Sequence, residues 1–222
     1  MTRSVLVVGA SRGIGLEFVR QYRAEGAEVI GTARDDAGLA RIEALGASAL
    51  RLDVVDAASA SSLGWQIDGA GLDVAIVNAG LLEGRGAGLT PNEDEFDRVM
   101  RTNVLGPMRV LPQIVEALAQ NGTIAVLSSR MGSIGARTSA GNSLYRASKA
   151  AANSVVKDAA LMHAAKATVV SLHPGWVKTD MGGSGADIDV ETSVAGMRRV
   201  IAGLSPRDSG AFFAYDGQAI AW

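Results

Sequence analysis

Short runs of apolar, often β-branched residues recur along the chain, and most of the segments between them are long enough for a helix. Such runs are typical of strands buried in a parallel sheet, and their alternation with helices is the signature of βαβ units. They predict seven strands, at residues 5–8, 28–32, 47–52, 73–77, 122–127, 167–172 and 211–215. We therefore expect an α/β protein with a single Rossmann-type domain over residues 1–222 and a doubly wound, mainly parallel seven-stranded sheet.

A glycine-rich turn, Gly9-Ala10-Ser11-Arg12-Gly13-Ile14-Gly15, follows the first predicted strand and precedes a helical segment that starts at Leu16. In this order of elements, backbone N–H groups and the positive end of the helix dipole point at a phosphate group. The spacing is Gly-x-x-x-Gly-x-Gly and not the dinucleotide fingerprint Gly-x-Gly-x-x-Gly. The prediction of a phosphate site therefore depends mainly on the position of the turn after the first strand.

The same turn also matches Gly-x-Ser-x-Gly, the nucleophile elbow of serine hydrolases, with Ser11 as the nucleophile. Such an elbow needs an oxyanion-hole donor from a loop that follows an earlier strand. Only eight residues precede Gly9 in this sequence, which is too short for that strand. A hydrolase is therefore the less favoured alternative.

Composition removes several other classes of function. The 222-residue chain has a formal net charge of −2 and no basic run, so we expect no nucleic-acid partner. It has no cysteine and only two histidines, His163 and His173, so we expect no metal site. No apolar stretch approaches the length of a membrane span and no signal peptide is evident, so we expect a cytoplasmic protein without a membrane partner.

Tyr145 and Lys149 stand four positions apart in a segment whose small and apolar residues predict a helix. Residues i and i+4 share one helical face, although this spacing alone also occurs by chance on solvated helices. Bringing a phenol to pKa ~7 requires a shift of about 3 units, or about 4 kcal/mol. An ammonium group about 4 Å away, at an effective dielectric constant near 20, supplies roughly that amount. The spacing therefore predicts that Lys149 lowers the pKa of Tyr145 and makes it a proton donor.

Polar residues follow the predicted strands at their carboxyl ends, where parallel sheets bind ligands. After the second strand, Ala33-Arg34 offers no carboxylate for the ribose 2′-hydroxyl of NAD, whereas an arginine suits the 2′-phosphate of NADP. Arg12 can add a second cation, and Asp53, after the third strand, is placed for the adenine. The later strands are followed by Asn78-Ala79-Gly80, by Ser128-Ser129 and by residues 174–179.

Together these motifs resemble those of the short-chain dehydrogenase/reductase family. The resemblance rests, in the family's order, on Gly9-x-x-x-Gly13-x-Gly15, Asp53, Asn78-Ala79-Gly80, Asn103, Ser129, Tyr145-x-x-x-Lys149 and Pro174-Gly175-x-Val177-x-Thr179. Residues 173–181 and 212–222 are similar to the carbonyl reductases of the sniffer and C-factor type. Ala221 stands where those proteins often have proline, a departure that concerns the tail and not the chemistry.

The resemblance implies an NADP(H)-dependent oxidoreductase that transfers hydride between the nicotinamide and a small carbonyl or alcohol substrate. Tyr145 would protonate the carbonyl oxygen, Lys149 would also hold the nicotinamide ribose, and Ser129 would bind the carbonyl oxygen. Asn103 would kink its helix and hold a water that relays protons to Lys149, and Thr179 would anchor the carboxamide. Cofactor contacts are expected from Gly9, Ser11, Arg12, Gly13, Ile14, Gly15, Arg34, Asp53, Val54, Asn78, Ala79, Gly80, Tyr145, Lys149, Pro174, Gly175, Val177 and Thr179.

Some choices stay open at the level of the sequence. Ser129 is preferred over Ser128 and Ser133, because two residues and a glycine follow it, as they follow the serine of the family. His173 is expected to be packed and hydrogen-bonded, and residues 182–185 are expected to form either a loop over the site or a plain surface loop. A cofactor-binding signalling or regulatory protein is the alternative to an enzyme, and a homodimer or homotetramer is compatible with the resemblance.

Overall fold

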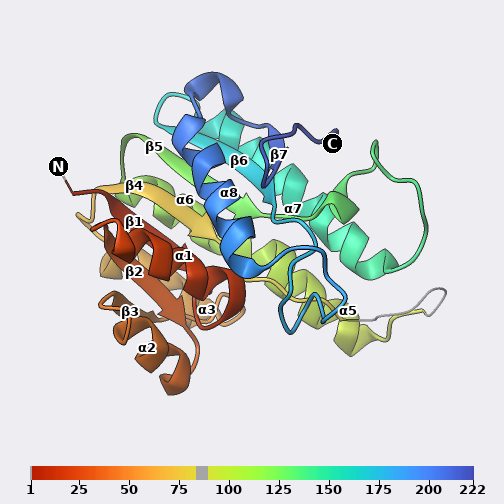
Figure 1. Cartoon of the computed structure of the whole chain (residues 1–222), viewed down its shortest axis with the longest axis horizontal. Coiled ribbons are helices and arrows are strands. Elements are labelled where there is room, and N and C mark those ends of the chain that lie inside the picture. Colours follow the sequence, from red (N-terminus) through yellow and green to blue (C-terminus); the bar gives the residue numbers. More distant parts are fainter. Residues whose placement is uncertain (1, 84–89) are drawn as a thin grey trace.

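The computed structural model describes residues 2–83 and 90–222, and its framework is one seven-stranded sheet (Figure 1). The strands are β1 (Ser4–Val8), β2 (Glu28–Ala33), β3 (Ser48–Arg51), β4 (Leu72–Val77), β5 (Leu118–Leu127), β6 (Ala167–His173) and β7 (Phe212–Ala214). They lie in the order β3-β2-β1-β4-β5-β6-β7, and every neighbouring pair is parallel. The predicted Rossmann-type parallel sheet is therefore confirmed.

β5 differs most from its prediction, since it begins four residues earlier than its apolar pattern indicated. β5 begins at Leu118 and not at residue 122, because Leu118 pairs with Leu72 before an irregularity in the ladder between β4 and β5. The inserted stretch is polar and contains Asn121 at a φ of 64°. The hydrophobic pattern could not reveal this extension, since it is interrupted there.

Helices cover both faces of the sheet (Figure 1). One layer contains α1 (Gly13–Ala24), α2 (Asp36–Glu43) and α8 (Val190–Gly203), and the other contains α3 (Ala57–Ser61), α4 (Leu63–Gln66), α6 (Gly106–Ala117) and α7 (Ser143–Met162). α5 (Glu93–Met100) continues through a π-helical segment, η1 (Arg101–Leu105), into α6. Short 3-10 helices are formed at η2 (Arg130–Gly132) and η3 (Pro206–Asp208).

Successive side chains of the central strands alternate between the two helical layers. In β1, Val5 and Val7 pack against the layer of α1 and α8, whereas Leu6 and Val8 pack against the layer of α6 and α7. All four side chains are fully buried. Burying each such side chain contributes about 1.5–3 kcal/mol, which explains why the strand is a continuous apolar run.

The order of the strands defines where a ligand can bind. β1 and β4 are neighbours, with β2 and β3 on one side of them and β5, β6 and β7 on the other. In such sheets the crevice for a ligand opens at the carboxyl ends of the two strands where the strand order reverses.

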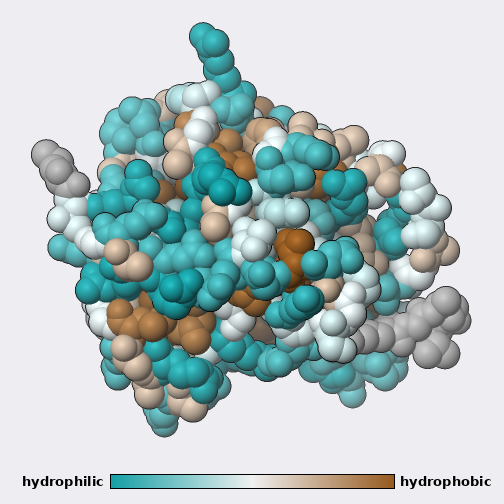
Figure 2. Space-filling model, viewed as in Figure 1, coloured by the Kyte–Doolittle hydropathy of each residue, from teal (hydrophilic) through white to brown (hydrophobic). Residues whose placement is uncertain are grey.

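The surface on the side of α1 and α8 is mostly hydrophilic, with apolar residues in small separate groups (Figure 2). Within residues 2–83 and 90–222, no helix is both long enough and apolar enough to cross a membrane.

Candidate active site

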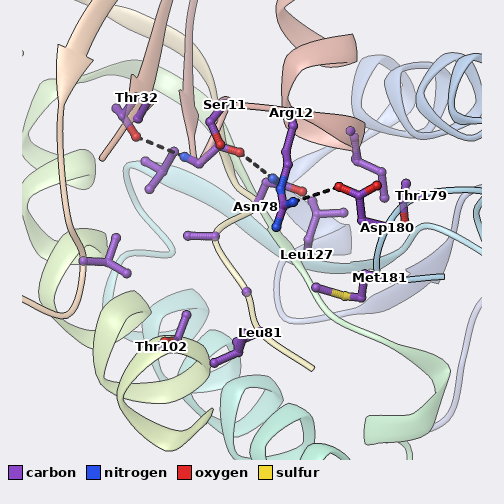
Figure 3. Close-up of a pocket in the computed structure, with 18 of the residues that line it drawn as sticks. Ser11, Arg12, Thr32, Asn78, Leu81, Thr102, Leu127, Thr179, Asp180 and Met181 are labelled. Atoms are coloured by element: carbon purple, nitrogen blue, oxygen red, sulfur yellow. Dashed lines mark hydrogen bonds and ion pairs between the residues drawn. The ribbon is translucent and has the colours of Figure 1, made fainter. Parts of the chain in front are cut away.

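A cleft of about 510 Å³ opens at the carboxyl ends of β1 and β4 (Figure 3). Its walls come from the glycine turn, the ends of the first four strands, α7 and the segment after β6. Of the residues predicted to contact a cofactor, fifteen line the cleft: Gly9, Ser11, Arg12, Gly13, Ile14, Arg34, Asp53, Val54, Asn78, Ala79, Gly80, Tyr145, Lys149, Pro174 and Thr179. Gly15, Gly175 and Val177 do not line it.

The glycine turn is held from both sides by β2 and β4. The Gly9 backbone N–H donates to Thr32 Oγ1 at 3.0 Å, and Asn78 Nδ2 donates to the Gly9 carbonyl at 2.6 Å. Gly15 packs α1 against this turn, because a Cβ there would lie 2.1 Å from the Gly9 carbonyl oxygen. Gly15 therefore permits close packing of helix and strand, and does not contact the cleft itself.

The far end of the cleft carries arginines and no free carboxylate on β2. Arg34 follows β2, is exposed and lines the cleft. The two aspartates next to it have other partners: Asp35 Oδ1 accepts from the Gly38 backbone N–H at 2.7 Å and caps α2, and Asp36 forms an ion pair with Arg51. This end of the cleft is therefore suited to an anion.

Tyr145 and Lys149 both lie on α7 and both line the cleft. The Lys149 Nζ lies 5.9 Å from the centre of the Tyr145 ring and donates to the Leu127 carbonyl at 2.8 Å. Both side chains are buried, with exposed fractions of 8% for Tyr145 and 6% for Lys149. The predicted helix and shared face are therefore present.

The predicted lowering of the Tyr145 pKa is wrong. Burial raises the pKa of Tyr145 to about 12, and its hydrogen bond with Ser129 lowers it only in part. Burial also lowers the pKa of Lys149 to about 8. A low-dielectric environment disfavours both the phenolate and the ammonium, and Lys149 directs its charge at Leu127, so the i, i+4 spacing does not decide the outcome.

The three candidate serines have different partners. Ser129 forms a hydrogen bond with the Tyr145 hydroxyl, whereas Ser128 Oγ donates to Asn153 Oδ1 at 2.6 Å inside the core. Ser133 Oγ donates to the carbonyl of Ala221, so it fastens the last residues of the chain to the loop after β5. Of these three, Ser129 interacts with the Tyr145 phenol, whereas Ser128 is the serine that lines the cleft, so the choice of Ser129 as the catalytic serine stays a prediction.

Asn103 lies in the π-helical segment η1, so the predicted distortion of its helix is present. Its Oδ1 accepts from the Leu81 backbone N–H at 2.7 Å, and its Nδ2 donates to the Leu81 carbonyl at 2.8 Å and to Ser148 Oγ at 2.9 Å. The side chain therefore joins the loop after β4 to α7 one residue before Lys149. Its role in holding a water stays a prediction.

The segment after β6 closes the cleft opposite the glycine turn. Gly175 has a φ of +85°, and a Cβ there would lie 2.6 Å from Ile188, so Gly175 shapes the backbone of this wall. Val177 is buried and pairs with Ile188. Thr179 Oγ1 accepts from the Gly182 backbone N–H at 3.0 Å, so the predicted loop at residues 182–185 is tied back to the cleft.

His173 differs from its prediction in one respect. It ends β6 and is packed, but its Nδ1 is buried and, among the residues that the structure describes, has no hydrogen-bond partner. The pKa of His173 is lowered to about 4, mainly by burial and also by the charge of Arg130, whereas the charge of Asp216 opposes the shift. His173 is therefore a neutral packing residue at neutral pH. Because no histidine is found among the described residues of the cleft wall, Ser11 also lacks the base that a serine hydrolase needs.

Sequence reasoning missed some residues of the cleft wall. Thr32 was missed because it lies inside β2, and its hydroxyl supports Gly9 only once β1 and β2 are paired. Lys178 and Asp180 flank Thr179 and could have been found from that position. Thr102 and Val190 gave no signal, since they belong to separate helical segments.

Comparison with known proteins agrees with this geometry. A family model described as short chain dehydrogenase matches residues 3–187. The C-signal protein of Myxococcus xanthus is 41% identical over 157 residues, covering 68% of this chain and 93% of that protein. A crystal structure of a short-chain dehydrogenase/reductase from Burkholderia multivorans with bound NADP has a TM-score of 0.91 at 31% identity, with 100% of both chains covered. The carbonyl reductase Sniffer of D. melanogaster has a TM-score of 0.89 at 29% identity and the same coverage. The chain belongs to the short-chain dehydrogenase family.

Proposed function

We propose that this protein is an NADP(H)-dependent oxidoreductase that reduces a small carbonyl compound, with residues 1–222 as a single catalytic domain. The observation that carries the proposal is the meeting of Tyr145, Ser129 and Lys149 beside a cleft with a glycine turn at its other wall. A protein that only binds a nucleotide has no evident use for a buried proton donor next to that nucleotide.

The residues of the cleft fit a dinucleotide. Gly13 has a φ of +53°, which lets the turn present its backbone N–H groups to a diphosphate without a side chain in the way. Arg34 and Arg12 would bind the 2′-phosphate of NADP(H), since Asp35 and Asp36 are engaged elsewhere. Asp53 and Val54 would hold the adenine, and Thr179 the carboxamide. NADPH, when bound, supplies the hydride.

The protonation states favour carbonyl reduction. A phenol with a pKa near 12 keeps its proton at neutral pH, so Tyr145 acts as an acid and gives that proton to the carbonyl oxygen. The Ser129 hydroxyl donates a hydrogen bond to the same oxygen as negative charge develops there. Lys149 is still largely protonated at pH 7, and its charge stabilises the phenolate that remains.

The test is turnover of NADPH with a panel of aldehydes and ketones, followed at the nicotinamide absorbance band. Tyr145→Phe should lower kcat by about 10²–10⁴-fold, as expected for loss of a general acid, and should leave the Kd for NADPH nearly unchanged. Tyr22→Phe is the matched control, because Tyr22 lies on α1 and outside the cleft wall. Full activity of Tyr145→Phe would refute the assignment.

The C-signal relative favours keeping one second candidate, a cofactor-binding signalling protein with incidental turnover. The same experiment separates the two. A signalling protein with incidental turnover would bind NADPH but reduce every carbonyl compound of the panel only slowly, whereas an enzyme should reduce at least one of them efficiently.

A homo-oligomer stays a prediction. Met108 on α6 and Leu161 and Met162 on α7 are exposed apolar residues of one helical layer, which is consistent with a second copy packing there. Sedimentation velocity measures the state directly.

A further inference from the structure

One ion pair spans the mouth of the cleft (Figure 3). Arg12 Nη1 and Asp180 Oδ2 lie 2.8 Å apart, although the two residues are 168 positions apart in the sequence. Arg12 belongs to the glycine turn, and Asp180 to the segment after β6. Both line the cleft, so the pair joins its two opposite walls.

The two partners are not equally able to move. The backbone around Asp180 is fixed, because the Gly182 N–H donates to Thr179 Oγ1 and the Gly183 N–H donates to the Thr179 carbonyl at 2.8 Å. A Cβ on Gly13 would lie 3.6 Å from the Thr179 methyl group, so the turn lies close to this segment. The guanidinium of Arg12, in contrast, sits on a long side chain that is 73% exposed. Arg12 can therefore change partner without any change in the fold.

We propose that Asp180 sets the affinity of the cleft for its cofactor by competing with a cofactor phosphate for Arg12. The proposal rests on the proposed function, since it requires a phosphorylated cofactor in this cleft. A guanidinium binds phosphate oxygens with two parallel hydrogen bonds, as it binds a carboxylate, so one Arg12 cannot serve both fully. A carboxylate left beside bound phosphate also repels it. Asp180 therefore weakens binding and speeds release of the oxidised cofactor.

The size of the effect follows from exposure. Asp180 is 78% exposed, and ion pairs between exposed groups contribute little because water and salt screen them. Asp180→Asn should therefore lower the Kd for NADP+ by only about two- to fivefold at low salt. The gain should shrink as salt is added.

The experiment is calorimetric titration of NADP+ into the whole protein and four variants. Asp180→Asn should bind NADP+ more tightly than the unaltered protein, and Arg12→Gln more weakly. In Arg12→Gln/Asp180→Asn, the asparagine should bring no gain, because no competition for Arg12 is left. Asp187→Asn is the matched control, since Asp187 is an exposed aspartate of the same segment and has no part in the cleft wall. It should leave the Kd unchanged.

A second titration with NAD+ identifies the phosphate. A gain confined to NADP+ assigns the 2′-phosphate to Arg12, and an equal gain with NAD+ assigns the diphosphate. A Kd unchanged by Asp180→Asn, or a gain that persists without Arg12, would overturn the competition. Neither result touches the proposed function, which instead fails if the unaltered protein binds NADP+ but reduces no carbonyl compound, or binds no dinucleotide at all.

Discussion

Burial acts on the two central side chains of the cleft in opposite directions. It raises the pKa of Tyr145 to about 12 and lowers that of Lys149 to about 8, because in both cases the neutral form is favoured away from water. At neutral pH the phenol is therefore neutral by a wide margin, whereas the ammonium is close to its pKa. Of the two, Lys149 is the group whose charge responds to small changes in its surroundings.

His173 gives a pH dependence to the stability of the fold. Its pKa in the folded protein is about 4, against 6.5 in the unfolded chain, so between these values the unfolded chain binds a proton that the folded protein does not. Stability is therefore fully present above pH 6.5 and is lost as the pH falls towards 4, by about 2–3 kcal/mol for this group. Urea unfolding across that range measures the loss.

Replacing the histidines separates this contribution from that of the carboxylates. His173→Asn should flatten the loss of stability between pH 6.5 and 4, relative to the unaltered protein. His163→Asn, at the end of α7, is the control for the loss of an imidazole as such. Identical slopes for His173→Asn and the unaltered protein would contradict the assignment.

At the residue scale, sequence patterns located the site better than they described its electrostatics. The position of Tyr145, Lys149 and Ser129 followed from motif order and strand ends. The pKa of Tyr145 did not, because it depends on how many neighbours exclude water, and no local spacing encodes that number. The pair of Arg12 and Asp180 was equally invisible, since its partners come from distant parts of the chain.

At the scale of elements, the π-helical segment η1 connects several parts of the site. It lies between α5 and α6, and through Asn103 it is bonded to the loop after β4 and to α7. Gly80 belongs to that loop, and a Cβ on Gly80 would lie 3.4 Å from the Lys149 Nζ. Three elements thus meet within a few ångströms of the buried lysine.

Removing the Asn103 amide should weaken the connection between η1, the loop after β4 and α7, and so lower the stability of the fold. Asn103→Ala removes the bonds to the Leu81 backbone N–H and carbonyl and the bond that the Ser148 hydroxyl accepts, although this hydroxyl still donates to the Tyr145 carbonyl. Buried groups left unpaired cost about 1–3 kcal/mol. Ser148→Ala removes one of the three bonds and should cost less. The midpoints of urea unfolding rank the two variants. A midpoint for Asn103→Ala equal to that of the unaltered protein would show that the Asn103 hydrogen bonds add no stability.

Elements with a clear hydrophobic pattern could be predicted from that pattern, whereas features that depend on contacts in the folded chain could not. The strands of the sheet followed from apolar runs that are buried on both sides. The start of β5 was not predicted, because it depends on pairing with Leu72, which exists only in the folded chain. The helix distortion at Asn103 was expected only from the family resemblance, and no hydrophobic period indicates it.

At the scale of the molecule, the cleft belongs to both halves of the sheet. The first half, β1 to β3, supplies the arginines and Asp53, and the second half, from β4 onward, supplies Tyr145, Lys149 and the segment after β6. A whole dinucleotide would span both halves, whereas its adenosine end would contact only the first.

Hydrogen exchange distinguishes binding of the whole dinucleotide from binding of its adenosine end alone. NADP+ should slow amide exchange in the glycine turn, at the end of β2 and in residues 174–183. The fragment 2′,5′-ADP should slow it in the turn and at the end of β2 only, because the fragment lacks the nicotinamide half. Equal protection of residues 174–183 by both ligands would contradict the assignment of the two ends.

The arrangement of the whole sheet was the most predictable property of the chain. Alternating strands and helices leave few ways to bury every strand, and the carboxyl edge where the order reverses then follows from topology. The contacts between the two walls of the cleft, such as the ion pair of Arg12 and Asp180, could be found only in the structure.

The fastening of the last residues has a practical consequence for fusion proteins. The Gly135 N–H donates to the Trp222 carbonyl at 2.8 Å, and the Trp222 ring stacks on Phe212 with centroids 5.5 Å apart. A segment joined after Trp222 would therefore be attached next to the loop that carries Ser129. Ser4, by contrast, is tied to Asp73 at the amino edge of the sheet, away from the cleft. An affinity handle or fluorescent reporter is therefore better placed ahead of β1.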